Sequence, residues 1–250
     1  KRQLNAHKIN AGELITLDNK NKDFFFFEKK DVRSVMGALV YLVKTRLPEY
    51  IGASPFEIQV LTPMRKGELG VEHLNEVLQY YLNPASESKK EKEGRTGVFR
   101  EGDKVMQVKN NYKLEWKITN AKGFSIEEGL GVFNGDMGII KQINTYSERI
   151  TVVFDENREA EYPFSSLDEL ELAYAITIHK SQGSEYPAVV LPLLSGPPIL
   201  CNRNLLYTAI TRAQKCVAIA GRQSMVEQMI HNETEQKRYS GLNDCLKEGL

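Results

Sequence analysis

Residues 172–185 read LAYAITIHKSQGSE, and residues 205–213 read LLYTAITRA. The first stretch is an apolar run that ends in a polar, glycine-containing turn. The second has apolar residues at helical spacing and ends in an arginine. Between them lies the apolar run 188–191, which is typical of a buried strand. Strand, polar turn, strand and helix is the pattern of a parallel sheet covered by helices, so this part of the chain predicts an α/β fold.

The same pattern continues toward the N-terminus. Residues 24–27 are four phenylalanines between charged residues, and they predict a strand buried on both faces. A base-stacking surface is the alternative for this run. Other elements follow from apolar spacing and breakers: a strand at 14–17, a helix at 32–47 that ends at Pro48, a strand at 58–61, a helix at 71–81, and a solvated or disordered loop at 85–97.

From residue 99 to about residue 170 the chain changes to short β-strands. Strands are expected at 105–108, 139–140 and 150–154, with a hairpin at Asn134-Gly135-Asp136. Residues 113–131 are expected to form a surface loop. The α/β pattern then returns, with strands expected at 173–176, 188–191 and 216–220, and helices at 204–213, 224–231 and 242–247. A β module inserted into an α/β domain follows from this order.

Residues 177–185 and 205–213 together resemble the fifth and sixth motifs of superfamily 1 helicases, in the RecD/TraA branch (SF1B). Residues 99–107 and 132–136 are similar to the start of that family's SH3-like insertion. The resemblance implies a RecA-like parallel-sheet domain, the second motor domain of a P-loop helicase without its own P-loop, with an inserted small SH3-like β-barrel. The implied boundaries are 1–98 and 172–250 for the motor domain and 99–171 for the insertion.

For the intact protein the resemblance implies ATP-dependent 5′-to-3′ movement on single-stranded DNA and unwinding of duplex DNA. ATP and Mg²⁺ would be bound mainly by an N-terminal motor domain of the same polypeptide, which carries the P-loop. Because the chain starts at Lys1 and not at a methionine, we interpret it as a fragment. A repair helicase, a nuclease-complex subunit similar to the exodeoxyribonuclease V alpha subunit, and a conjugative TraA protein all remain open.

Four residues of the 177–185 stretch are candidate ligand contacts at an edge of the sheet. Thr177 and His179 are expected to donate hydrogen bonds to DNA phosphates. Gly183 lets backbone N–H groups approach a nucleotide phosphate, because it has no Cβ. Glu185 is expected to accept a ribose hydroxyl. The alternative is that His179 caps a helix and Glu185 pairs with a surface lysine.

Arg212 is the candidate catalytic residue. A guanidinium carries a permanent charge and several donors in a fixed plane, which suits a γ-phosphate that gains charge during transfer. A structural salt bridge is the commoner role of a helical arginine, but the surrounding residues of the motif favour the catalytic one.

Further DNA contacts are expected after the strand at 58–61 and near the N-terminus. Residues 62–65, which include Thr62 and Arg65, resemble a helicase motif between the fourth and fifth, and Asn75 lies on the helix that follows. Arg65 is expected to face either phosphate or solvent. His7 lies in a stretch similar to the one just after the fourth motif. Turn and capping chemistry is the alternative for these positions.

Residues 152–156 read VVFDE and look like a Walker B strand with acids for Mg²⁺. A strand returns at hairpin distance, however, so a charged hairpin tip is the better interpretation. The chain contains no G-x-x-x-x-G-K-[ST] sequence. A non-catalytic module that docks a protein or a nucleic acid on a helicase-like scaffold is therefore the alternative function.

Composition limits the choice further. The chain has 33 Lys and Arg and 33 Asp and Glu residues, so any DNA site must be a local groove and not a basic face. Cys201, Cys216 and Cys245 lack C-x-x-C spacing, which argues against zinc and fits a reducing cytoplasm. Cys216 is expected in the core. The sequence shows neither a signal peptide nor an apolar run long enough to span a bilayer.

Overall fold

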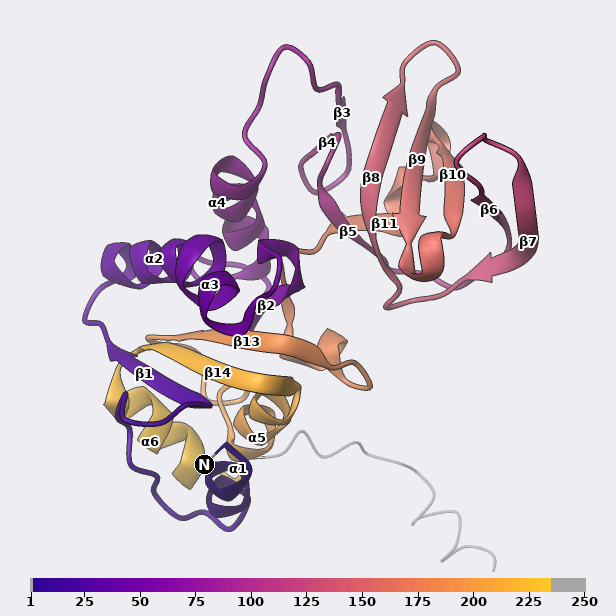
Figure 1. Ribbon diagram of the computed structural model, residues 1–250. Coiled ribbons are helices and arrows are strands. Elements are labelled where there is room, and N and C mark those ends of the chain that lie inside the picture. Colours follow the sequence, from indigo (N-terminus) through magenta and orange to yellow (C-terminus); the bar gives the residue numbers. More distant parts are fainter. Residues whose placement is uncertain (1, 235–250) are drawn as a thin grey trace, which may run out of the picture.

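The computed structural model describes residues 2–234, and its centre is a five-stranded parallel sheet (Figure 1). The order across the sheet is β1 (Phe24–Glu28), β14 (Ala213–Gly221), β13 (Tyr186–Leu193), β2 (Ile58–Thr62) and β12 (Ala175–Thr177). Every neighbouring pair is parallel. Because parallel strands need crossover connections, helices are carried to both faces of the sheet.

Six α-helices cover the sheet (Figure 1). One face carries α2 (Val32–Tyr41), α3 (Leu47–Ile51) and α4 (Val71–Leu82), and the other carries α1 (Arg2–Asn10), α5 (Arg203–Thr211) and α6 (Gln223–His231). Side chains of one strand alternate between the faces. Val60 thus joins the core beneath α2 and α4, whereas Leu61 joins the core beneath α5 and α6. Cys216 is fully buried, as expected.

The N-terminal elements differ from the prediction in three places. Residues 14–17 form no strand. β1 lies at an edge of the sheet, so only Phe24 and Phe26 are buried, and Phe25 and Phe27 are partly exposed. Pro48 does not end the helix, because the helical backbone continues without a break from α2 through the π-helical turn Leu42–Arg46 into α3. The helical path ends at Gly52, whose φ of 66° suits a glycine.

The inserted segment forms a separate antiparallel sheet (Figure 1). Its order is β11 (Leu170–Leu172), β5 (Lys104–Gln107), β8 (Met137–Asn144), β9 (Arg149–Phe154), β10 (Glu159–Pro163), β6 (Asn111–Thr119) and β7 (Ser125–Val132). β9 and β10 pair around residues 155–157, so the VVFDE run is a hairpin and not a Walker B strand. The predicted fold class, a parallel α/β domain with an inserted β module, is confirmed.

Details of the insertion correct three predictions. The turn at Asn134-Gly135 forms, but β7 and β8 on its two sides do not pair, so it is not a hairpin. Residues 113–131, expected as a loop, form most of the hairpin β6–β7. Within 85–97, β3 (Glu91–Glu93) pairs with β4 (Val98–Arg100). The sequence of β3 is wholly charged, which hides a strand from hydrophobic patterning.

The insertion is joined to the sheet by buried polar groups as well as by a shared core. The Asp103 carboxylate accepts hydrogen bonds from Gln79 (2.6 Å), Asn83 (2.7 Å) and Tyr174 (2.8 Å). Burial raises the pKa of Asp103, although these donors oppose the shift. The neighbouring Lys104 ammonium donates to Gln59 Oε1 (2.8 Å) of β2. Burial lowers the Lys104 pKa to about 7.

Some predictions fall outside the described residues, namely Cys245 and the helix at 242–247. Within residues 2–234, no helix has the length and apolar character needed to cross a membrane. The same part of the chain holds no group of three or more His, Cys, Asp or Glu side chains arranged to bind a metal.

Candidate functional site

Most of the predicted site residues lie at the ends of the strands of the parallel sheet. We call the side on which the strands end the carboxyl edge, and the side on which they begin the amino edge. Thr177 is level with Thr62 at the carboxyl ends of β12 and β2. Tyr186 is level with Ala213 at the amino ends of β13 and β14. Residues 178–185 connect β12 to the parallel strand β13, so they run from one edge to the other. The 177–185 motif therefore contributes to both edges.

At the amino edge, Arg212 follows α5 and precedes β14. Its Nε donates to Thr208 O (3.2 Å), its Nη1 to Ser184 O (3.2 Å) and its Nη2 to Thr211 Oγ1 (3.3 Å). All three acceptors are neutral. Within residues 2–234 no carboxylate forms an ion pair with this guanidinium, so its positive charge is uncompensated. The side chain is partly exposed.

Gly183 and Glu185 lie in the segment that holds Arg212. Gly183 has a φ of 87°, and a Cβ built on it would meet no atom within 4 Å. Its backbone is therefore open to an approaching ligand. Glu185 is exposed, and its carboxylate accepts a long hydrogen bond (3.4 Å) from Gln214. The structure thus brings together three of the predicted residues, Gly183, Glu185 and Arg212.

At the carboxyl edge, Thr177 caps the 3-10 turn Ile178–Ser181. Its Oγ1 accepts a hydrogen bond from the Lys180 backbone N–H (3.3 Å), which leaves the hydroxyl proton free to donate. Thr177 is partly exposed and His179 is exposed. Two predicted phosphate donors thus share one turn.

An ion-pair cluster lies beside this turn. Arg65 Nη2 is 2.7 Å and Lys180 Nζ is 3.0 Å from the Glu171 carboxylate. Burial alone would raise the pKa of Glu171, but the hydrogen bonds from Arg65 and Lys180 outweigh it and the pKa is lowered. Arg65, predicted to face phosphate or solvent, pairs with Glu171, and its side chain is 40% exposed. The sequence motif contained Lys180 but offered no reason to select it, and Glu171 lies 106 residues from Arg65.

Thr62 and Asn75 lie behind the surface. Thr62 is fully buried, and its hydroxyl donates to Leu69 O (2.7 Å). Asn75 is 5% exposed, and its amide bonds to Leu172 O, Ala175 O and Ala175 N. These contacts match the turn-and-cap alternative and do not leave either side chain facing a phosphate. Asn75 thus braces the strand that ends at Thr177, and Thr62 braces the loop that contains Leu69.

His7 is not brought together with the other candidates. It is exposed on α1, which packs against α5 on the face of the sheet opposite to α4 (Figure 1). It remains a prediction without structural support.

The two edges differ in the ligands that they fit. The free charge of Arg212 and the open backbone at Gly183 suit a phosphate group. Mg²⁺ prefers carboxylate and water oxygens, and the described residues provide no cluster of acids for it. The amino edge fits the phosphate end of a nucleotide.

Two family models match parts of this chain. Residues 74–154 match a family model described as the SH3 domain of ATP-dependent RecD-like DNA helicases, and residues 172–220 match one described as the UvrD-like helicase C-terminal domain. The chain is related to the RecD-like DNA helicases. The resemblance noted in the sequence is thus confirmed, and the insertion corresponds to the RecD-like SH3 domain.

Two curated relatives and one solved structure illustrate this similarity. The ATP-dependent RecD2 DNA helicase of Deinococcus radiodurans is 39% identical over 67% of this chain and 20% of its own length. The RecBCD enzyme subunit RecD of Mycolicibacterium smegmatis is 30% identical over 76% of this chain and 29% of its own length. A Pif1 helicase from Bacteroides, solved with ADP-AlF3 and ssDNA, shares 18% identity at a TM-score of 0.48, over 99% of this chain and 53% of the other. The chain spans less than a third of either curated relative.

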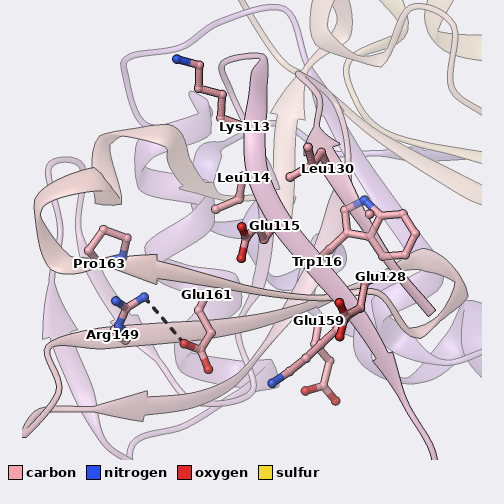
Figure 2. A pocket seen from close by; sticks show the side chains of 12 residues that line it. Lys113, Leu114, Glu115, Trp116, Glu128, Leu130, Arg149, Glu159, Glu161 and Pro163 are labelled. Carbon is pink, nitrogen blue, oxygen red and sulfur yellow. Dashed lines mark ion pairs between the residues drawn. The ribbon is translucent and has the colours of Figure 1, made fainter. Parts of the chain in front are cut away.

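The RecD-like insertion also carries a groove of about 660 Å³ between the β6–β7 hairpin and strands β9 and β10 (Figure 2). Trp116 and Leu130 form apolar parts of its lining. Four glutamates and three cations also line it, namely Glu115, Glu128, Glu159, Glu161, Lys113, Lys117 and Arg149. Arg149 pairs with Glu161 at 3.7 Å. This acid-rich lining is unsuited to a phosphate backbone.

Proposed function

We propose that this chain is the second motor domain of an ATP-dependent DNA helicase of the RecD type, which moves 5′ to 3′ on single-stranded DNA. The observation that carries the proposal is Arg212, whose charge is held at the amino edge by three neutral acceptors. A guanidinium held in this way keeps its attraction for a polyanion. The family relationship supports the proposal.

In this proposal the two edges have separate tasks. Arg212 binds the γ-phosphate from across a cleft, and Gly183 and Glu185 contact the nucleotide beside it. The P-loop lysine and the Mg²⁺ ligands come from a first motor domain. Thr177 and His179 at the carboxyl edge hold DNA phosphates. ATP binding closes the two motor domains and hydrolysis lets them reopen. The DNA strand moves because its phosphates are bound and released in turn during this cycle.

The test is Arg212→Ala in the full-length protein that contains this chain. We expect ATP turnover to fall by about 10³–10⁵-fold, as for other arginine fingers. The affinity for a single-stranded oligothymidylate should stay within twofold, because Arg212 lies at the other edge of the sheet. Steady-state ATP hydrolysis and fluorescence anisotropy measure the two quantities. Normal turnover in this variant would overturn the proposal.

A binding module is the second candidate, and the groove in the insertion favours it. A groove with apolar parts at Trp116 and Leu130, and with four glutamates against three cations, suits a basic peptide segment of a partner protein better than DNA. In that case Trp116→Ala should abolish partner binding, and Arg212→Ala should have no effect on any activity.

A further inference from the structure

Lys180 is the cation with free donors at the carboxyl edge. Its side chain is 30% exposed, and its ammonium donates one hydrogen bond, to Glu171 Oε2 (3.0 Å). Within residues 2–234 this ammonium makes no other hydrogen bond or ion pair. An ammonium has three donors, so two remain for solvent or a ligand. Lys180 also lies in the same turn as Thr177 and His179.

Glu171 is held in place by Arg65, which forms ion pairs with two carboxylates. The Arg65 guanidinium donates two hydrogen bonds to Glu171 (2.7 and 3.3 Å), and its Nε lies 3.6 Å from Glu72. Bidentate pairs of this kind fix both partners in one plane. The Glu171 side chain is 19% exposed, less than either cation. The carboxylate is therefore a rigid acceptor that fixes the position of the Lys180 ammonium.

The position of Glu171 in the chain adds to this geometry. Glu171 belongs to β11, the last strand of the insertion, and is level with Met106 of β5. Arg65 lies in the loop after β2, and Lys180 lies in the turn after β12. One carboxylate thus joins the insertion to both polar segments of the carboxyl edge.

We infer that Lys180 is a further DNA-phosphate ligand and that Glu171, clamped by Arg65, is the positioning residue that holds Lys180 beside Thr177 and His179. This inference rests on the proposed function, since it names another contact of the same DNA path. Lys180 supplies charge and two free donors, whereas Glu171 touches no phosphate. Removing Glu171 therefore weakens DNA binding, although it removes a negative charge from the path.

The experiment measures the affinity of the full-length protein for a fluorescent oligothymidylate over a range of salt concentrations. Lys180→Gln should lower the affinity about tenfold, as expected for one charge-assisted hydrogen bond, and reduce the slope of log K against log[salt] by about 0.7. Lys180→Arg should restore most of that slope. Glu171→Gln should lower the affinity about threefold in the wild-type background and not at all in the Lys180→Gln background, because it acts through Lys180.

Two surface ion pairs provide matched controls. Glu91→Gln removes a carboxylate that pairs with Arg100 at 2.6 Å, and Lys141→Gln removes an ammonium that pairs with Glu159 at 2.6 Å. Both changes alter net charge as the test variants do, and both should leave DNA affinity within twofold. Thermal melting of every variant separates loss of a ligand from loss of folding.

The possible outcomes distinguish failure of the Lys180 and Glu171 roles from failure of the proposed helicase function. Tighter binding by Glu171→Gln, the result of simple charge removal, overturns the positioning role. Wild-type affinity in folded Lys180→Gln overturns the phosphate contact, while the helicase proposal stands. A wild-type protein that does not bind the oligothymidylate overturns both.

Discussion

The two edges of the parallel sheet hold their arginines in different ways. At the amino edge Arg212 donates to neutral carbonyl and hydroxyl oxygens. At the carboxyl edge Arg65 is bound by two carboxylates. A neutral acceptor orients a guanidinium without cancelling its charge, whereas a carboxylate cancels most of it. The comparison indicates that the charge of Arg212 remains available to an anionic ligand. The charge of Arg65 instead stabilises contacts within the protein.

The same substitution at each edge gives the sharpest test of this difference. Arg212→Lys keeps the charge but loses the planar fork, so we expect ATP turnover of the full-length protein to fall about 100-fold. Arg65→Lys should lower affinity for single-stranded DNA about threefold through Glu171 and change turnover at saturating DNA by less than threefold. ATP hydrolysis and anisotropy report the two effects. Equal losses of turnover in both variants would contradict the separation of the edges.

Lys104 tests the buried connection between the insertion and β2. The unfolded chain holds the lysine proton up to the ordinary pKa of 10.5, whereas the folded state releases it above about 7. Between these values the unfolded state binds more protons, so stability rises with pH. We expect about 2 kcal/mol of rise between pH 7 and pH 9 from this residue. Urea unfolding of Lys104→Met should lack this rise, and an identical slope in the variant would refute the assignment.

Tyr174 tests the neighbouring hydrogen-bond network. Its hydroxyl donates to the buried Asp103 carboxylate at 2.8 Å. Tyr174→Phe removes this donor and leaves the carboxylate less well satisfied, so we expect a loss of about 1–2 kcal/mol in the free energy of unfolding. Tyr146→Phe is the control, because Tyr146 is 97% exposed. Equal urea midpoints for the two variants would show that this hydrogen-bond network does not help to anchor the insertion.

The smallest effect is expected at the amino edge. Thr211→Val removes one of the three acceptors of Arg212 but keeps the shape of the side chain. ATP turnover should fall about fivefold, equivalent to about 1 kcal/mol, with DNA affinity unchanged. Thr208→Val retains the backbone carbonyl that binds Arg212 and is the control. A larger loss in the control would show that the helix, and not the hydroxyl, holds the arginine.

Much of the fold was predictable because local patterns in the sequence indicated its strands and helices. The apolar runs of β2, β13 and β14 and the helical spacing of α4 and α5 needed no tertiary information. The errors arose where local patterns were silent or misleading. The hairpin β6–β7 is mostly solvent-exposed, so it has few buried residues to mark its strands. Pro48 marked a helix end, but the helical backbone passes through it from a π-helical turn into α3.

The candidate site was predictable only in part. The motifs selected Arg212, Gly183, Thr177 and His179, and the structure leaves all four partly or fully exposed. The stretch at 62–65 and the helix after it also supplied Thr62 and Asn75, which are buried with their polar atoms occupied. A motif identifies polar residue types near a strand end. Whether each side chain faces solvent or the backbone depends on packing against distant segments.

The sequence alone was enough to predict most strands and helices of the parallel sheet, the presence of an inserted β module and the relationship to RecD-like helicases. These properties depend on periodicity and on short motifs, which are local. The three-dimensional structure was needed to show that residues 177–185 contribute to both edges and that Arg212 donates to neutral acceptors. It was also needed to show that Glu171 pairs with both Arg65 and Lys180. Such facts depend on which distant segments meet, and side-chain partners 106 residues apart leave no local pattern to detect.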